Sequence, residues 1–562
     1  MKLVECVPNF SEGRDLSIIK QITDEIETVE GVKLLDVDPG QATNRTVVTI
    51  VGTPDEVIEA AFRAVKKASE LIDMRSHHGA HPRFGATDVC PLVPVANITM
   101  EEVAEYSHKL AKRIGEELNI PIYCYESAAK IKERRNLAYC RSGEYEGLKD
   151  KITKPEWKPD FGSATFNASA GATAVGARDF LIAVNYNLNT TSTRRANALA
   201  FDVREKGRPM REGNSVTGKI AKDELGKEIM IPGTLKATKA IGWFIDEYGI
   251  AQVSMNITNI SVTPLHIAFD EVCAKAQARG LRVTGTEIVG LVPKRTLIEA
   301  GKYFLQKQQR SVGVSEKELI KIAIKSMGLD DLKPFNPEEK IIEYMLDAEN
   351  KQNKLVDMTC TAFANETASE SPAPGGGSIS AYMAALGVSL GTMVANLSSH
   401  KAGWDERWEE FSVWAEKGQI LKDELLHLVD EDTTAFNKIM DALGLPKGTE
   451  QEKITRKQAL QDATLYATLV PFRSMEKALE GFEICKAMVK IGNPNSVTDA
   501  GVGALCCRSA VMGAFLNVKI NAVGLDDKEK AKELINNGSI IEAKAQSLES
   551  EILAIVNEKI NS

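Results

Sequence analysis

Hydrophobic and polar positions follow two alternating periods along the first part of the chain. Short runs rich in β-branched and apolar residues are typical of strands, and longer segments with apolar residues every three or four positions indicate helices. Strands are predicted at 2–7, 32–37, 46–52, 89–95 and 122–125, and helices at 16–29, 54–72 and 99–118. This order predicts an α/β sandwich in which helices cover a sheet.

The alternation restarts after residues 155–176, which are expected to form a loop. Strands are predicted at 180–186, 240–244, 252–257 and 282–284, and helices at 193–206 and 264–279. Strand ends that carry asparagine, as in Val7-Pro8-Asn9 and Val184-Asn185, recur at equivalent places. We therefore expect two similar lobes, at 1–177 and 178–336, with a cleft between them where ligands are often found.

The pattern changes at Pro337, after which strand signals almost disappear. Residues 347–354 are polar enough for a linker, and from Pro372 the periodicity is almost entirely helical. The fold class predicted for the chain is α+β, with two sheet-plus-helix lobes followed by an all-α domain. The boundaries expected are 337–354 for the linker and 355–562 for the helical domain.

One uncharged segment is long enough to cross a membrane. Residues 371–399 contain no charged side chain, but they use Ala, Gly, Ser and Thr where a lipid-facing helix would use Leu and Ile. Gly387 and Gly391 permit close helix contacts. We expect a helix buried inside the protein and no membrane span.

Composition and charge narrow the classes of partner. The 562 residues are 43% hydrophobic and 26% charged, which is typical of a soluble globular protein. A net charge of −9 argues against a general nucleic-acid binder, which needs a basic face. The nine cysteines lack metal spacing, and the amino terminus has no long apolar region, so a cytoplasmic protein without a signal peptide is expected.

Three of the seven histidines lie within residues 77–81, in a turn where Gly79 and Pro82 exclude a helix. Such a turn favours proton-transfer chemistry, because histidine changes charge near neutral pH. The alternatives for His81 are a histidine satisfied by backbone groups and a zinc ligand, but no nearby Cys or carboxylate has suitable spacing. Asp36 and Asp38 end what we expect to be a buried strand, where a carboxylate can orient an imidazole.

Two further segments each have an ordinary and a functional interpretation. Residues 161–173 are small and polar, so they form either a simple loop or a surface that binds the edge of a flat heterocycle. Residues 206–239 form either an exposed hairpin or a mobile basic loop over an acidic ligand. The lysines that would favour carboxylates there are Lys219, Lys222, Lys236 and Lys239.

An acid interrupts an apolar stripe in the helical part. The stripe consists of Leu421, Leu425, Leu428, Phe436, Ile439 and Leu443. Asp432 lies four residues after Leu428 and four before Phe436, so it is expected to face the core. There it either forms a buried salt bridge or acts as an acid with a raised pKa. Asp430 and Glu431 lie off the stripe and are expected to be solvated.

A glycine-rich turn, Ala373-Pro374-Gly375-Gly376-Gly377-Ser378, precedes a predicted helix. Free amides at a helix start can hold an anion, and the simpler interpretation is a helix-start loop. The turn lacks the Lys-Ser/Thr ending of a Walker A loop.

Long motifs resemble the bifunctional formimidoyltransferase-cyclodeaminase family over nearly the whole chain. Those that resemble the transferase part are Leu3 to Gly13, Leu34 to Arg45, His81-Pro82-Arg83 through Pro91, and Gly290-Leu291-Val292-Pro293. The Ala-Pro-Gly-Gly-Gly-Ser turn and Asp430-Glu431-Asp432 resemble the cyclodeaminase part.

The resemblance implies two consecutive reactions of one-carbon metabolism and histidine degradation. The lobes would transfer a formimidoyl group from N-formimidoyl-L-glutamate to tetrahydrofolate, with His81 as the catalytic histidine and Asp38 as its orienting carboxylate. The helical domain would close the product to 5,10-methenyltetrahydrofolate with loss of ammonia, as an ammonia lyase, with Asp432 as the acid. The positions that match folate-binding segments are Gly162, Ser163, Ala164, Thr165, Phe166, Asn167, Ala168, Ser169, Ala170, Gly171, Gly233, Thr234, Leu235, Lys236, Ala237, Thr238, Lys239, Ala240, Ile241 and Gly242.

The resemblance also implies polyglutamylated tetrahydrofolate as co-substrate, no metal, and a homo-oligomer arranged as a ring of dimers. Two alternatives stay open. The same fold can act as a glutamate formyltransferase or a methenyltetrahydrofolate cyclohydrolase, or the chain can be a silent folate-binding scaffold. The chain departs from the family pattern in a longer segment at 207–232 and in Glu431, which replaces a small residue.

Overall fold

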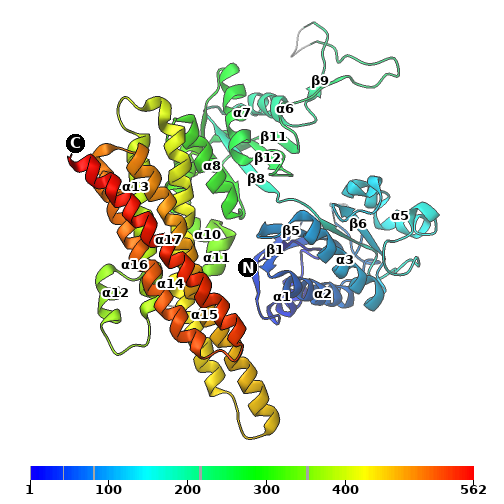
Figure 1. Ribbon diagram of the computed structural model, residues 1–562. Helices are drawn as coiled ribbons and strands as arrows, with labels where there is room; N and C mark the ends of the chain where they lie inside the picture. The colour runs from blue at the N-terminus through cyan, green and yellow to red at the C-terminus, as the bar shows by residue number, and fades with distance from the viewer. Residues whose placement is uncertain (1, 42–43, 80–82, 214–217, 350–353, 562) are drawn as a thin grey trace. The chain divides into compact units, whose positions relative to one another are not determined.

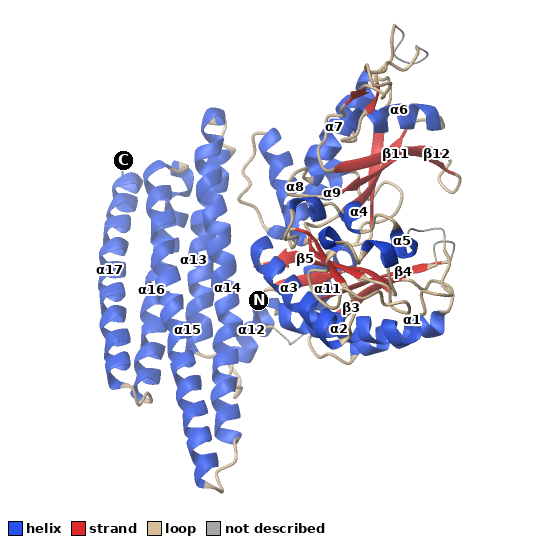
Figure 2. Ribbon diagram, turned by 90° about the vertical axis from the view of Figure 1, so that its right-hand side faces the viewer, coloured by secondary structure: helices blue, strands red, loops and turns tan. Residues whose placement is uncertain are grey.

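The computed structural model describes residues 2–41, 44–79, 83–213, 218–349 and 354–561. Contacts between residues divide the chain into two compact units. The first contains Met1–Thr296 and Met327–Leu346, and the second contains Leu297–Ser326 and Asp347–Ser562. Figures 1 and 2 show that strands occur in the first unit and that the second is helical. The predicted domain limits at 177, 336 and 354 stay predictions.

The first lobe of the first unit is built on a seven-stranded mixed sheet. Its elements are β1 (Leu3–Cys6), β2 (Asn9–Phe10), α1 (Leu16–Glu27), β3 (Val32–Gly40), β4 (Arg45–Gly52), α2 (Pro54–Leu71), β5 (Thr87–Ala96), α3 (Met100–Glu117), β6 (Ile122–Glu126), α4 (Leu137–Cys140), α5 (Glu144–Lys151) and β7 (Thr173–Ala177). β1 and β2 pair with β4 on one side and with β5 on the other, β3 extends the sheet beyond β4, and β7 and β6 follow β5 in parallel. Helices α1, α2 and α3 pack on this sheet.

The second lobe has a smaller antiparallel sheet. Its elements are β8 (Ile182–Leu188), α6 (Thr193–Val203), β9 (Arg208–Pro209), β10 (Met230–Ile231), β11 (Thr238–Ile245), β12 (Ile250–Ile257), α7 (Leu265–Ala278), β13 (Val283–Val289), α10 (Pro337–Lys340) and α11 (Ile342–Glu349). The four strands are in the order β11-β12-β8-β13, and α6 and α7 pack against them. The fold class predicted for the two lobes is confirmed.

The segment between α6 and β11 forms a hairpin, as its ordinary interpretation predicts. β9 pairs with β10, and isolated bridges join Arg211 to Ile220 and Lys222 to Glu228. Lys219 and Lys222 are exposed, and so are Asp223 and Glu224 beside them. Acidic side chains therefore accompany the lysines of this hairpin.

The second unit is all-helical, as predicted. It contains most of α8 (Lys294–Lys307), α9 (Glu316–Met327), α12 (Cys360–Thr367), α13 (Gly376–Ser399), α14 (Trp408–Gly444), α15 (Glu450–Ile491), α16 (Val497–Val523) and α17 (Lys528–Asn561). Among the described residues, two helical segments are long and apolar enough to cross a membrane, Gly376–Ser399 and Pro494–Val523. The most apolar part of the first is 61% buried, and this helix packs against α14, α15 and α16. That packing agrees with the core helix predicted for residues 371–399.

The longest strand that was missing from the sequence prediction is β7. Residues 173–176 were expected to belong to a loop, but together with Ala177 they form β7, between β5 and β6, and all five residues are buried. Their sequence, Thr-Ala-Val-Gly-Ala, is rich in residues with low strand propensity. Small residues are needed here because the ring of Tyr125, which is 2% exposed, lies against Gly176.

We predict that Gly176→Ala destabilises the first lobe. The added Cβ would lie 2.5 Å from Cε1 of Tyr125, and overpacking of this kind costs about 1–3 kcal/mol. Calorimetry of the full chain should show a lower melting temperature for the transition of this lobe. Gly147→Ala in α5 is the matched control, because a Cβ there meets no atom within 4 Å. Equal melting temperatures for the two variants would contradict this packing argument.

Two candidate active sites

The first candidate site begins with the alternation of side chains along the seven-stranded sheet. Val4 and Cys6 of β1 lie in the core beneath α2, so Glu5 between them faces the opposite side of the sheet. In β4, Val48 and Ile50 belong to the same core, which leaves Thr49 on the side of Glu5. Polar groups therefore collect on the face that α1, α2 and α3 do not cover.

This face borders a cleft of about 610 Å³ within the first unit. Residues of both lobes line it: Glu5, Val7, Leu35, Asp36, Asp38, Val47, Thr49, Arg178, Phe180, Leu181, Ala183, Val289, Gly290, Leu291, Glu339, Lys340 and Met345. The cleft between lobes that the sequence predicts is thus present. Carboxylates from the first lobe share it with the cations Arg178 and Lys340.

Asp38 lies in this cleft, but its strand is not the buried strand that the sequence predicted. Within the described residues β3 pairs with β4 alone, so it forms an edge of the sheet, and Asp36 and Asp38 are exposed. Asp38 stands opposite Val47 of β4. Val32, Leu34 and Val37 of β3 pack against the helical core, whereas both aspartates line the cleft together with Leu35.

Glu5 is a cleft residue that sequence reasoning did not single out. It is 5% exposed, and burial raises the pKa of its carboxyl group to about 7, although the positive charge of Arg178 lowers it in part. A carboxyl group with this pKa can gain or lose a proton near neutral pH. The available signal was one acidic residue in an otherwise apolar strand.

The histidine turn is anchored to the loop that follows β3. His81 lies outside the described residues, as do Ala80 and Pro82. His77 and His78 precede these residues in the chain. Nε2 of His77 is 2.8 Å from the carbonyl oxygen of Asn44, and the Asn44 side chain donates a hydrogen bond to the carbonyl of His78 over 3.0 Å. Burial lowers the pKa of His77, so this imidazole is mainly neutral at pH 7.

The predicted folate segment 162–171 lies against the other side of the same turn. Gly171 forms a bridge with Gly85, and the amide of Ala86 donates to the carbonyl of Ala170 over 2.8 Å. A Cβ on Gly85 would lie 2.2 Å from the carbonyl oxygen of Ala172, so only glycine fits this crossing. The segment therefore adjoins the residues that follow His81, although it does not line the cleft of Glu5.

The other predicted folate segment, 233–242, leads into β11 and continues along it. Thr238 and Ala240 are buried, and Gly242 exchanges two 3.0 Å hydrogen bonds with the side chain of Asn197 in α6. Lys239 and Ile241 alternate with them and are exposed on the opposite face. This segment also stays outside the lining of the Glu5 cleft.

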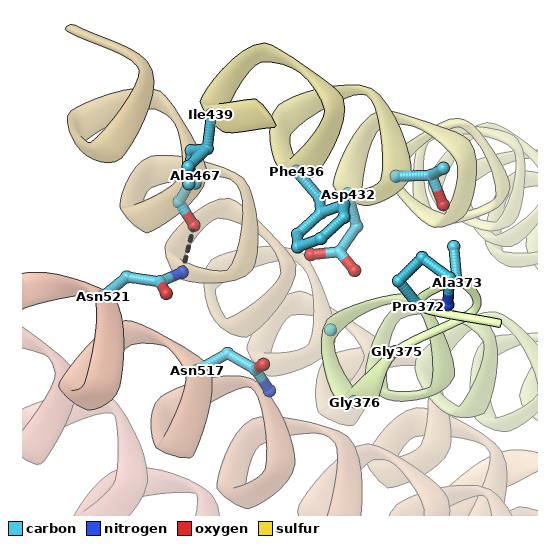
Figure 3. A pocket seen from close by; sticks show the side chains of 12 residues that line it. Pro372, Ala373, Gly375, Gly376, Asp432, Phe436, Ile439, Ala467, Asn517 and Asn521 are labelled. Carbon is cyan, nitrogen blue, oxygen red and sulfur yellow. Dashed lines mark hydrogen bonds between the residues drawn. The ribbon is translucent and has the colours of Figure 1, made fainter. Parts of the chain in front are cut away.

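The second candidate site is a pocket of about 140 Å³ at the start of α13 (Figure 3). Its lining consists of Pro372, Ala373, Gly375, Gly376, Gly377, Asp432, Thr433, Phe436, Ile439, Ala467, Asn517 and Asn521. The predicted acid and the glycine-rich turn, far apart in sequence, thus share one pocket. Asn517 and Asn521 join them from α16.

Asp432 is held by the first turn of α13. Its Oδ2 accepts hydrogen bonds from the amide of Ser378 at 2.8 Å and from the Ser378 hydroxyl at 2.9 Å. Burial raises the pKa of the Asp432 carboxyl group, and the two bonds from Ser378 offset part of that rise. A Cβ on Gly377 would lie 2.2 Å from Oδ1 of Asp432, so this close contact requires glycine.

The apolar stripe of α14 agrees with the prediction only before Asp432. Leu421, Leu425 and Leu428 are at most 5% exposed, but Phe436 is 38% and Leu443 is 44% exposed. Asp432 therefore stands where the buried core ends and the pocket begins. In the second half of the stripe, only Ile439 packs against the core, where it is partly buried.

The expectation that Asp430 and Glu431 are solvated was wrong. Oδ1 of Asp430 accepts a 2.7 Å hydrogen bond from the amide of Leu355. Glu431 accepts a 2.6 Å bond from the hydroxyl of Tyr466 and forms an ion pair with Arg473. Both acids have partners because α15 and the segment before α12 pack along the sides of α14.

No group of three His, Cys, Asp or Glu side chains able to hold a metal ion occurs among the residues that the structure describes. All nine cysteines are free thiols. The cleft of Glu5 is lined by carboxyl groups and the cations Arg178 and Lys340, and the pocket of Asp432 by carboxyl, amide and hydroxyl groups.

Comparisons with known proteins cover both units. The chain matches the formiminotransferase domain, N-terminal subdomain, at residues 3–178, the formiminotransferase domain at residues 183–347, and formiminotransferase-cyclodeaminase at residues 359–538. The formimidoyltransferase-cyclodeaminase of Gallus gallus is 40% identical over 558 residues, which are 99% of this chain and 99% of that protein.

Two shorter relatives each correspond to part of the chain. The glutamate formimidoyltransferase of Streptococcus pyogenes serotype M1 is 41% identical over 305 residues, which are 54% of this chain and 94% of that protein. The methenyltetrahydrofolate cyclohydrolase of Methylorubrum extorquens is 34% identical over 203 residues, which are 36% of this chain and 98% of that protein.

We predict that Glu5→Gln changes stability in a pH-dependent way. The folded state raises the pKa of Glu5 from 4.5 to about 7, so folding favours the protonated acid and becomes less favourable as the pH rises between these values. The glutamine variant should be more stable than the natural chain above pH 7, by up to about 3 kcal/mol, and this gain should vanish below pH 4.5. Melting temperatures of the variant and of the natural chain at pH 4, 6 and 8 measure this difference in stability.

The exposed Glu30→Gln is the control for this comparison. A difference between Glu5→Gln and the natural chain that stays constant from pH 4 to pH 8 would show that Glu5 is not desolvated in the cleft.

Proposed function

Because this chain belongs to the formimidoyltransferase-cyclodeaminase family, we propose that it joins two reactions of folate chemistry. The first transfers a formimidoyl group from N-formimidoyl-L-glutamate to N5 of tetrahydrofolate. The second closes 5-formimidoyltetrahydrofolate to 5,10-methenyltetrahydrofolate and releases ammonia. The observation that carries the proposal is the 40% identity with a protein of that name over 99% of both chains.

The transfer step needs a group that moves protons between two nitrogens. N5 of tetrahydrofolate attacks the formimidoyl carbon and loses a proton, and the departing glutamate nitrogen gains one. His81 is assigned this role and Asp38 that of its orienting carboxylate, on the basis of the family resemblance. The position of 162–171 beside the residues after His81 supports the assignment of this segment to folate.

The charges of the cleft favour a formimidoyl over a formyl donor. An amidine carries a positive charge when protonated, and the exposed Asp36 and Asp38 offer carboxylates to it, beside Glu5, which can lose its proton near neutral pH. Arg178 and Lys340 offer cations to the carboxylates of the glutamate portion. A formyl group is neutral and would gain nothing from the acidic part of the cleft.

The deamination step needs an acid, and it needs a folate whose N10 is held close to the formimidoyl carbon. N10 belongs to the same molecule as the formimidoyl carbon, so its attack is intramolecular and the correct geometry supplies much of the acceleration. Asp432 can donate a proton to the departing nitrogen because its raised pKa increases the protonated fraction. Asp432 is therefore proposed as the catalytic acid of the helical site.

A second candidate function keeps the fold and changes the leaving group. A relative that matches 36% of this chain is named methenyltetrahydrofolate cyclohydrolase, so the helical site can be considered for the interconversion of methenyl and formyl folates with water. An aspartic acid can serve either reaction. Release of ammonia distinguishes the two functions.

The remaining parts of the proposal concern location and assembly. We propose a cytoplasmic protein without a membrane span, which takes polyglutamylated tetrahydrofolate and forms a homo-oligomer, a ring of dimers. A stripe of apolar side chains on α16 that are 42% to 72% exposed supports the oligomer: Val502, Leu505, Met512, Leu516, Ile520 and Val523. Their spacing of mostly three and four residues is typical of helices that pack together.

We predict that the two activities can be removed separately. His81→Ala should abolish the transfer of the formimidoyl group while supplied 5-formimidoyltetrahydrofolate is still deaminated, because the acid of the second site is intact. Asp432→Ala should lower deamination by about a hundredfold or more and leave transfer unchanged. Glutamate release measures the first step and ammonia release the second. Equal loss of both activities in folded protein would contradict the assignment.

We also predict that the 61.3 kDa chain assembles through the α16 stripe. Light scattering should give a mass several times that of one chain. Val502→Glu should lower this mass because it places a charge among apolar contacts. The exposed Asn557→Glu at the end of α17 is the control. A natural chain that is monomeric at micromolar concentration would contradict the prediction.

A further inference from the structure

Asn517 and Asn521 form a pair of amides on one face of α16. A separation of four residues places two side chains above one another on a helix, and both asparagines line the pocket of Asp432 (Figure 3). Their helix is otherwise mostly apolar on its inner side, where Ala514 and Val518 are fully buried. Two polar groups at the edge of such a core indicate a ligand that needs them.

Hydrogen bonds to backbone carbonyls fix the orientation of both amides. Nδ2 of Asn517 donates to the carbonyl of Gly513 over 2.9 Å, and Nδ2 of Asn521 donates to the carbonyl of Ala467 over 2.7 Å. No described residue donates a hydrogen bond to either side-chain oxygen. Two acceptors are therefore left for whatever occupies the pocket.

The other walls of the pocket fit a flat, partly apolar ring. Phe436, Ile439 and Pro372 contribute apolar surface, and Asp432 contributes the acid. Asn517 also lies close to the backbone of α13, since a Cβ on Gly376 would be 3.2 Å from Nδ2 of Asn517. The absence of side chains on the glycines keeps the space between the acid and the amides open.

We propose that Asn517 and Asn521 determine the specificity of this pocket by binding the donor edge of a reduced pterin. That edge carries the 2-amino group and N3–H, which match the two free oxygens of the asparagines. The carboxylate-bearing tail of a folate has only acceptors at its end and gains nothing from these oxygens. Binding of the ring by its donor edge leaves N5 and its substituent for Asp432.

This inference rests on the proposed deamination and goes beyond it by naming the residues that select the ring. Two acceptors on the wall of a partly enclosed pocket also discriminate against rings without donors, because such a ring would displace water from the acceptors without replacing its hydrogen bonds. The asparagines are thus positioning and specificity residues, and the proton chemistry stays with Asp432.

The test uses Asn517→Ala and Asn521→Ala in the full chain, with 5-formimidoyltetrahydrofolate as substrate. Each variant should raise KM by about tenfold or more and change kcat by less than about threefold. Inhibition by 6-methyltetrahydropterin, which has the donor edge and no tail, should weaken to a similar extent. Inhibition by p-aminobenzoylglutamate, which has the tail and no pterin, should not change.

Serine variants at the two positions serve as the conservative replacement. A hydroxyl oxygen is an acceptor, so Asn517→Ser and Asn521→Ser should recover part of the affinity for 6-methyltetrahydropterin. Asn536→Ala, an exposed asparagine on α17, is the matched control and should behave like the natural chain.

Three results would overturn the inference. An unchanged KM in folded alanine variants would show that the asparagines do not bind the substrate. A fall in kcat at constant KM would assign them to the departing ammonia. Weakened inhibition by p-aminobenzoylglutamate alone would assign them to the tail. A natural chain that releases no ammonia would instead refute the proposed function itself, so the two failures are distinguishable.

Discussion

Close approach at glycine is the constraint that joins the residues after the histidine turn to segment 162–171 and that places the start of α13 against Asp432. At Gly85 the residues after the histidine turn cross the segment 162–171, and a Cβ there would meet a carbonyl oxygen at 2.2 Å. At Gly377 the first turn of α13 meets Asp432 at the same separation. In both places the glycine has no side chain, so two segments that lie far apart in sequence can come into contact. At Gly85 these are the residues after the histidine turn and segment 162–171, and at Gly377 they are the start of α13 and Asp432 of α14.

Periodicity was sufficient to predict most of the fold. Most of the longer helices and strands of both lobes were expected because apolar residues alternate with two clear periods, and the all-helical region was expected because strand signals end near Pro337. The strand β7 was missed because its alanines and glycine give no strand signal, although its burial on both faces demands small residues. Whether β3 is buried or at an edge was not predictable, since strand order is a property of the whole sheet.

The candidate sites were predictable to the extent that a polar residue violates an apolar pattern. Asp432 interrupts a stripe and lies in a pocket, although its partner is Ser378 at a helix start and not a cation. Glu5 interrupts an apolar strand in the same way. Asn517 and Asn521 carry a weaker signal, and only the packing of α16 beside α13 brings them to the acid. The partners of Asp430 and Glu431 come from other segments, so helix periodicity alone could not show them.

The stoichiometry of a coupled reaction tests the two-site account most directly. The natural chain is mixed with N-formimidoyl-L-glutamate and tetrahydrofolate, and glutamate, ammonia and the absorbance of 5,10-methenyltetrahydrofolate are followed together. The account predicts one glutamate, one ammonia and one methenyl product for each donor molecule consumed. Glutamate without ammonia, or a methenyl product formed from a formyl donor with no ammonia, would contradict it.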